Sequence, residues 1–224
     1  MSALAARSEL TARRDPAALT GLLFGVVTVV GLFTTAFFAE GSYPLPDAPL
    51  ADVRQFFQTN AGTAQAQAVW QVAASVLLVA FACTVSAAIR PFSATLAGVA
   101  QAGGVLSGGF FGLSAVLVGV LGSHQFSRAA EVVHPAHLFG FLAGGPAHVV
   151  WLGVLVGAMS LAGLRFGMLP RWLSISGLVS ATLSLLSALA PMVWEATAFL
   201  PLGRFSGILV LAAASVILSR RQLR

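Results

Sequence analysis

Charged residues are scarce in this sequence. Asp, Glu, Lys and Arg make up 8% of its 224 residues, whereas about a quarter of the residues are charged in soluble globular domains. Hydrophobic residues make up 58% of the chain, and the mean hydropathy is +0.91. This composition excludes an ordinary soluble domain and predicts an integral membrane protein.

The chain has one cysteine and no lysine. The single cysteine, Cys83, excludes an internal disulfide and every metal motif built from several cysteines. Because Cys83 falls within an apolar run, we expect a small, buried side chain there. Lysine is absent and all twelve basic residues are arginines. Membrane orientation explains the placement of these arginines, so the net charge of +5 predicts no nucleic-acid partner.

Six apolar runs are long enough to cross a bilayer, for which a helix needs about 20 residues. They cover residues 18–39, 67–89, 92–122, 135–164, 172–194 and 198–219. The first run is too long for the core of a signal peptide, and Phe37 is too large for a cleavage site, so we expect this run to be retained. We therefore predict an all-α, polytopic membrane bundle with six transmembrane helices in one domain, residues 18–219. Residues 1–17 and the basic tail 220–224 flank it.

The arginines predict how the chain is oriented in the membrane. Placing the N-terminus in the cytoplasm puts nine arginines on the inner side, and only Arg54, Arg128 and Arg204 on the outer side. Positive charge is normally kept on the cytoplasmic side. We therefore predict a multi-pass protein of the cell membrane with both termini cytoplasmic and most acidic residues outside.

The longest outer connection, residues 40–66, predicts a short amphipathic helix. Asp47 is the expected cap at its start, and Thr63 the expected cap of the next span. Four apolar residues fall on one helical face. They are Leu50, Val53, Phe56 and Phe57. We favour packing of this face onto the bundle over a role in sensing lipids.

Glycines predict where helices touch. Gly104, Gly108 and Gly112 repeat every four residues on one face of the third span, which allows another backbone to approach closely. Glycines in the fourth span make it the natural neighbour. They are Gly140, Gly144, Gly153 and Gly157. Packing within the chain is the favoured interpretation, and a homo-oligomer or partner-protein interface through the third-span glycines is the alternative.

Three of the four histidines lie in the segment EVVHPAHLFGFLAGGPAHVV, residues 131–150. Glu131, His134 and His137, with His124 upstream, offer carboxylate and imidazole ligands for a divalent ion. Their spacing matches no established metal motif. We favour histidines that bond to neighbouring loops or headgroups, and we predict no metal.

His148 lies about 16 Å deeper than His137 along the same helix. Gly144, Gly145 and Pro146 precede it and should disrupt the helix and free backbone carbonyls. An ionisable group at this depth is a candidate proton carrier or ligand contact, although a neutral histidine bonded between helices is the favoured interpretation. No second span carries an interior histidine for haem, so no cofactor is predicted.

Arg204 opens the sixth span and requires a partner. The sequence leaves two kinds of partner possible. One is a carboxylate of Glu195, Glu131 or Glu40 in an ion pair, and the other is an anion or lipid headgroup bound jointly with Arg128. Aromatic anchors are expected at the membrane interfaces, and Trp151 is expected to pack more deeply. The anchors are Trp70, Trp172 and Trp194.

Three stretches resemble a group of uncharacterised six-span integral membrane proteins of the actinobacterial type. They are LTGLLFGVVTVVGLF, YPLPDAPLADVRQFFQTNAGTAQAQ and LRFGMLPRWLSISG. The resemblance implies an inner-membrane location and the six-helix layout. That group has no assigned reaction, so the resemblance transfers no site residues.

Three functional hypotheses follow. The favoured one is a non-catalytic membrane module that binds a partner protein or lipid through its outer face; a membrane enzyme for a lipidic or terpenoid substrate and a small-molecule transporter or channel are the alternatives. The catalytic candidates are His148, His137, Glu131 and Glu195. The ligand-binding candidates are Arg128, Arg204, His134 and Trp151. Membrane lipids are the expected partners.

Overall fold

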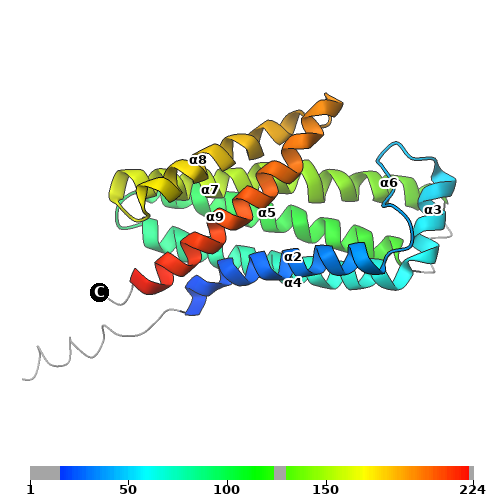
Figure 1. The fold of residues 1–224 in the computed structure, drawn as a ribbon, viewed down its shortest axis with the longest axis horizontal. Coiled ribbons are helices and arrows are strands. Elements are labelled where there is room, and N and C mark those ends of the chain that lie inside the picture. The colour runs from blue at the N-terminus through cyan, green and yellow to red at the C-terminus, as the bar shows by residue number, and fades with distance from the viewer. Residues whose placement is uncertain (1–15, 124–129, 222–224) are drawn as a thin grey trace, which may run out of the picture.

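The computed structural model describes residues 16–123 and 130–221 and is all-α over that part of the chain (Figure 1). Its helices are η1 Pro16–Leu19, α2 Thr20–Phe38, α3 Leu50–Thr59, α4 Ala61–Ile89, α5 Ala94–Leu121, α6 Ala130–Leu142, η2 Ala143–Ala147, α7 His148–Phe166, α8 Arg171–Leu186, η3 Ser187–Leu189, η4 Trp194–Ala198 and α9 Phe199–Arg221. Six segments are long and apolar enough to cross a membrane. The predicted six-span bundle is therefore confirmed.

The bundle has two distinct ends (Figure 1). At one, called here the terminal end, the start of the first span packs on the last helix: Ser215 Oγ donates to Ala18 O and accepts from Leu22 N. At the other, the α3 end, α3 packs across α6 and the start of α4.

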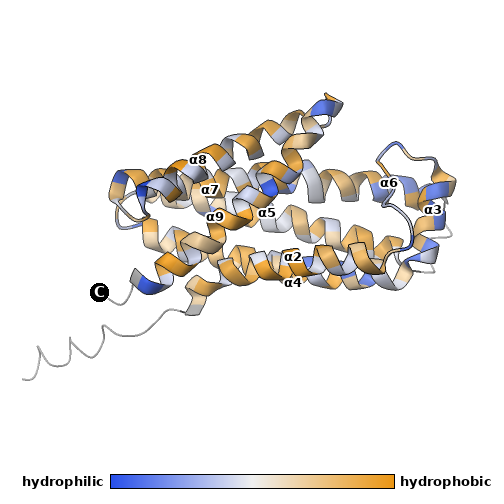
Figure 2. Ribbon diagram, in the orientation of Figure 1, coloured by the Kyte–Doolittle hydropathy of each residue, from blue (hydrophilic) through white to orange (hydrophobic). Residues whose placement is uncertain are grey.

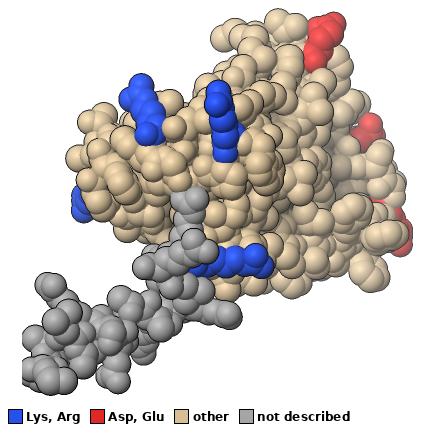
Figure 3. Space-filling view, turned by 60° about the vertical axis from the view of Figure 1, so that its left-hand side comes forward, with Lys and Arg blue, Asp and Glu red and all other residues tan. Residues whose placement is uncertain are grey.

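Charge is divided between these ends. Figure 3 shows arginines on the terminal end and acidic side chains on the opposite side. Exposed arginines near the terminal ends of the helices are Arg90, Arg165, Arg171 and Arg220. The described acidic residues are all exposed and lie away from that end, in connections or in short helices and helix starts: Glu40, Asp47, Asp52, Glu131 and Glu195. This asymmetry is the pattern from which we predicted the orientation.

The short amphipathic helix is confirmed as α3, and it packs onto the bundle. Val53 and Phe57 are fully buried, in a cluster with Val118 and Leu121 of α5 and Val133 of α6. α3 therefore closes one end of the bundle through apolar contact.

Both predicted caps around α3 are wrong. Pro49 takes the N-cap position of α3, and its carbonyl accepts from Asp52 N and Val53 N, so Asp47 lies outside the helix in a turn. α4 begins at Ala61, directly after the junction residue Asn60. Thr63 therefore lies inside the first turn of α4 and does not cap it.

The fourth span is one 36-residue apolar segment that contains a π-helical turn, η2. Here His148 N–H donates to Ala143 O, five residues earlier. Pro146 has no N–H to donate, which favours such a local departure from α-helical bonding. The disruption predicted at Gly144, Gly145 and Pro146 is thus confirmed.

The third-span glycines are explained by packing within the chain. A Cβ on Gly104 would lie 2.1 Å from Ala82 Cβ, and one on Gly108 would lie 2.7 Å from Val79 Cγ2, so this face contacts α4, the second span, and the predicted fourth-span neighbour is wrong for these glycines. Gly103 approaches α7 instead, where a Cβ would lie 2.6 Å from Leu155 N.

The fourth-span glycines divide between two neighbours. Gly140 and Gly144 lie against Leu117 and Ser114 of α5, as expected. Gly153 and Gly157 lie against α8 instead, where Cβ atoms would meet Ser184 and Ala181. The glycines in the first half of the span therefore pack against α5, and those in the second half pack against α8.

Cys83 is exposed, so the expectation of a buried side chain is wrong. Figure 2 shows apolar residues spread along the long helices, including their outward surfaces. A helix facing lipid is apolar on its outer side as well as its inner side, so an apolar run alone does not indicate burial.

Candidate functional site

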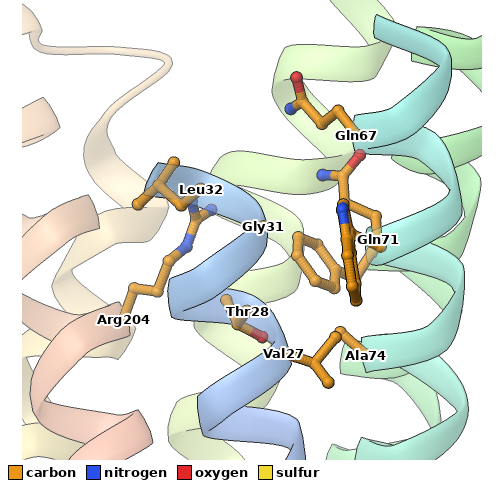
Figure 4. A pocket seen from close by; sticks show the side chains of 10 residues that line it. Val27, Thr28, Gly31, Leu32, Gln67, Gln71, Ala74 and Arg204 are labelled. Atoms are coloured by element: carbon orange, nitrogen blue, oxygen red, sulfur yellow. The ribbon is translucent and has the colours of Figure 1, made fainter. Parts of the chain in front are cut away.

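A cavity of about 70 Å³ lies between four helices of the bundle (Figure 4). α2, α4, α5 and α9 provide its lining. The lining residues are Val27, Thr28, Gly31, Leu32, Gln67, Trp70, Gln71, Ala74, Phe111 and Arg204. A guanidinium, two amides and a hydroxyl therefore interrupt an otherwise apolar interior.

The cavity lies at a depth that the bilayer covers. Along their helices, Arg204 is 17 residues from the terminal end of α9, Gln71 is 18 from that of α4, and Phe111 is 17 from that of α5. At 1.5 Å per residue these separations are roughly 26 Å. The hydrocarbon core is about 30 Å thick. Arg204 and Gln71 therefore lie at about the same level, inside the membrane-spanning part of their helices.

Arg204 is the cation of this cavity. Its Nη2 donates to Gly144 O, and its buried Nε has no hydrogen-bond partner among the described residues. Gly144 lies in the η2 turn, where the departure from α-helical bonding frees backbone carbonyls for such a partner.

The ion pair predicted for Arg204 does not form with the described carboxylates. Glu40, Glu131 and Glu195 are all exposed, and the recorded partner of Arg204 is a carbonyl instead. A carbonyl offers only a partial charge, so the full positive charge of Arg204 has no balancing anion within the described chain. Arg128, its proposed co-ligand, lies outside the described residues.

Two further polar atoms of the lining have no partner. Thr28 Oγ1 and Gln71 Oε1 are buried and unbonded in the described structure. Other helical threonines bond to the carbonyl four residues earlier: Thr34 to Val30 O at 2.7 Å and Thr84 to Ala80 O at 3.1 Å. Thr28 makes no such bond, and its hydroxyl oxygen is buried, so the hydroxyl reaches the cavity by rotation of the side chain.

His148 is completely buried next to the cavity but does not line it. Its Nδ1 lies 3.1 Å from Ser107 O and 2.9 Å from Ser107 Oγ, and Ser107 Oγ donates to His148 O at 2.9 Å. Phe111, a lining residue, stacks on the imidazole with ring centroids 4.4 Å apart. This histidine is bonded between α5 and α7, as the favoured interpretation held.

His137 belongs to a separate cluster under α3. Its Nε2 bonds to Leu45 O at 3.1 Å, and Tyr43 and Phe57 lie against the ring. Burial raises the pKa of Tyr43 to about 12. This histidine therefore fastens the connection before α3 to α6.

The remaining predicted site residues do not converge. His134 and Glu131 are exposed on α6, Glu195 is exposed in η4, and Trp151 is half-buried on α7 outside the cavity lining. Among residues 16–123 and 130–221, no three His, Cys, Asp or Glu side chains could hold a metal ion together. His124 lies outside the described residues.

Sequence reasoning missed most of the cavity. Trp70, predicted as an interfacial anchor, lines the cavity and packs on Gly31, where a Cβ would lie 2.9 Å from Trp70 Cβ. The available signal was Gln67 and Gln71, two amides one helical turn apart in an apolar span.

The fold and the cavity together define the class of this chain as a multi-pass helical membrane protein. The chain matches no family model, and neither a curated protein nor a solved structure matches it. Its function is therefore argued from the cavity itself.

Proposed function

We propose that this chain is a non-catalytic membrane module that binds a lipid-like ligand through the cavity between α2, α4, α5 and α9. One observation carries the proposal: Arg204 lies inside a membrane span, beside a cavity, and no described carboxylate balances its charge. A charge at this depth is costly unless it is paired. An anionic headgroup is the counter-charge that a bilayer supplies.

The cavity is accessible from the surface of the bundle. Leu32 of α2 and Trp70 of α4 line it, and both are also exposed, at 43% and 37%. These outer surfaces of membrane helices face lipid acyl chains. A ligand with a charged head and an apolar tail therefore fits the site, with the head against Arg204 and the tail between Leu32 and Trp70.

The enzyme alternative is supported less well. His137 and His148 are held by backbone and serine partners, and neither lines the cavity. Glu131 and Glu195 are exposed and also lie outside the cavity lining. Among the described residues, no carboxylate or imidazole therefore lines the site to act as acid or base on a bound ligand.

The transport alternative requires a path towards the terminal end. One turn beyond Thr28 and Ala74 in that direction, Phe24 and Leu78 are fully buried, as is the nearby Phe81. These close-packed side chains fill the interior, so a ligand that enters the cavity stops there.

The test is the lipid content of the purified protein. Wild-type protein and the Arg204→Met variant are extracted in mild detergent, and native mass spectrometry and lipid extraction measure the bound lipid. We expect about one retained lipid per wild-type chain and at least tenfold less with Arg204→Met. Arg90→Met, which removes an exposed arginine at the terminal end, is the matched control and should retain lipid. Equal lipid retention by all three proteins would overturn the proposal.

A further inference from the structure

We infer that the cavity selects a tetrahedral oxyanion, a phosphate group, as the head of its ligand. This inference rests on the proposed function and narrows the ligand of the same site. Four polar side chains line the cavity from three different helices: Thr28 on α2, Gln67 and Gln71 on α4, and Arg204 on α9. Figure 4 shows these side chains arranged around one space.

The wall of the cavity is rich in donors. Arg204 has five N–H donors, and the structure records a bond from Nη2 to Gly144 O while Nε stays unpaired. Gln71 contributes the two N–H groups of Nε2, for which the described chain records no hydrogen bond, and Thr28 contributes a hydroxyl whose Oγ1 has no partner there. Because these donors approach the cavity from three helices, a ligand that satisfies them must present hydrogen-bond acceptors in three directions.

A carboxylate meets this requirement poorly. It is planar and presents two oxygens, so it pairs well with one guanidinium and leaves the third direction without an acceptor. A phosphate presents three or four oxygens in a tetrahedral arrangement. It can therefore accept from Arg204, Thr28 and Gln71 at the same time.

The volume agrees with this choice. A water molecule needs about 10–15 Å³ of cavity space. The cavity offers about 70 Å³, which is room for a small polar head but not for a long chain. A longer tail must lie outside, past Leu32 and Trp70.

Two sources can supply this group, a phosphomonoester lipid and free inorganic phosphate. The experiment uses wild-type protein in phosphatidylcholine nanodiscs and measures binding of dodecyl phosphate, dodecanoate and inorganic phosphate by native mass spectrometry and thermal shift. The two amphiphiles share a tail length and differ in the head. We expect dodecyl phosphate to bind at least tenfold more tightly than dodecanoate, which is about 1.4 kcal/mol, and inorganic phosphate to bind weakest.

Substitutions in the cavity lining test whether those side chains cause the preference for phosphate over carboxylate. Thr28→Val and Gln71→Leu should each lower dodecyl phosphate affinity about tenfold and change dodecanoate affinity less than twofold. Thr34→Val is the matched control, because the Thr34 hydroxyl is already bonded to Val30 O. It should leave the binding of both amphiphiles unchanged.

Each result separates this inference from the proposed function. Equal affinities for the two amphiphiles, both lost in Arg204→Met, would overturn the phosphate inference and keep the lipid-binding module. Tight binding of inorganic phosphate with no gain from a tail would keep the phosphate head and overturn the lipid-like ligand. No binding of any probe, with a cavity that holds water only, would overturn both.

Discussion

Two side-chain amides eleven positions apart, Asn60 and Gln71, have opposite surroundings. Asn60 joins α3 to α4 and is 4% exposed. Its Oδ1 accepts from Glu40 N at 2.7 Å, and its Nδ2 donates to Glu40 O and Phe56 O, both at 3.0 Å. Gln71 borders the cavity, and its buried Oε1 has no partner in the described structure.

The difference separates an amide whose hydrogen bonds are made within the described chain from one whose oxygen has no partner there. Buried polar groups are normally bonded, and one left unbonded destabilises the fold by about 1–3 kcal/mol. Asn60 meets this rule within the chain, so the α3 end is complete as it stands. Gln71, Thr28 and Arg204 each keep one buried polar atom that does not meet it within the described chain.

The largest effect is expected from Asn60→Ala. It removes three hydrogen bonds and leaves the Glu40 backbone groups without partners, so we expect the free energy of unfolding to fall by about 3 kcal/mol. Unfolding in mixed detergent micelles measures this change. Gln58→Ala, on an exposed neighbour, should change it by less than about 0.5 kcal/mol. A small effect of Asn60→Ala would erase the contrast between the two amides.

Gly144→Ala should have the next largest effect. The added Cβ would lie 2.3 Å from Ser114 Oγ and 2.9 Å from Ser114 Cβ, so the wall that carries the Arg204 partner must shift. Such overpacking destabilises by roughly 1–3 kcal/mol. Gly145→Ala is the adjacent control, since its Cβ would meet only Leu200 Cδ1 at 3.9 Å. Similar thermal unfolding of the two variants would contradict this geometry.

Arg204→Met tests the opposite case, a buried polar group whose removal should not destabilise the fold. Because it removes a buried charge that no described carboxylate balances, we expect the ligand-free protein to be unchanged or stabilised by about 1 kcal/mol. Gln71→Leu should likewise change the stability by less than about 0.5 kcal/mol. Unfolding after delipidation measures both. A loss above about 2 kcal/mol for Arg204→Met would show that this arginine is structural.

The smallest effect is spectroscopic and concerns Tyr43, the single tyrosine of the chain. Its ring packs edge-on against Phe56 and Phe57 and is partly exposed. Since the folded pKa is raised to about 12, ultraviolet titration should give a midpoint above the ordinary value of 10. Any stability from the neutral phenol is complete below pH 10 and is lost as the pH rises towards 12. Denatured protein should titrate near 10, and an identical midpoint in folded protein would place this ring in open solvent.

Composition and periodicity were sufficient to predict the bundle. The six spans, the amphipathic helix and the disruption before His148 follow from apolar run length, from the spacing of Val53 and Phe57, and from Pro146. These features are local, because each depends on residues close together in the chain. The predicted helix caps, although equally local, were wrong. Pro49 precedes α3 where Asp47 was predicted, and Asn60 precedes α4 where Thr63 was predicted.

The cavity was harder to predict because it is a property of four helices. Arg204 was recognised as a residue that needs a partner, but the partner sought was a carboxylate and the observed one is Gly144 O. Thr28 looks like any helical threonine in sequence, and only its missing bond to the preceding turn sets it apart. Gln71 is brought opposite Arg204 by tertiary packing, which hydrophobic periodicity does not encode.

The π-helical turn at η2 amounts to one extra residue inserted into an otherwise regular rod. The wide turn, closed by the bond from His148 N–H to Ala143 O, holds that extra residue without rotating one half of the span against the other. His148 therefore keeps its contact with Ser107, and Gly153 its contact with Ser184. One residue added elsewhere in the span, with no such turn to absorb it, would rotate everything beyond it by about 100°.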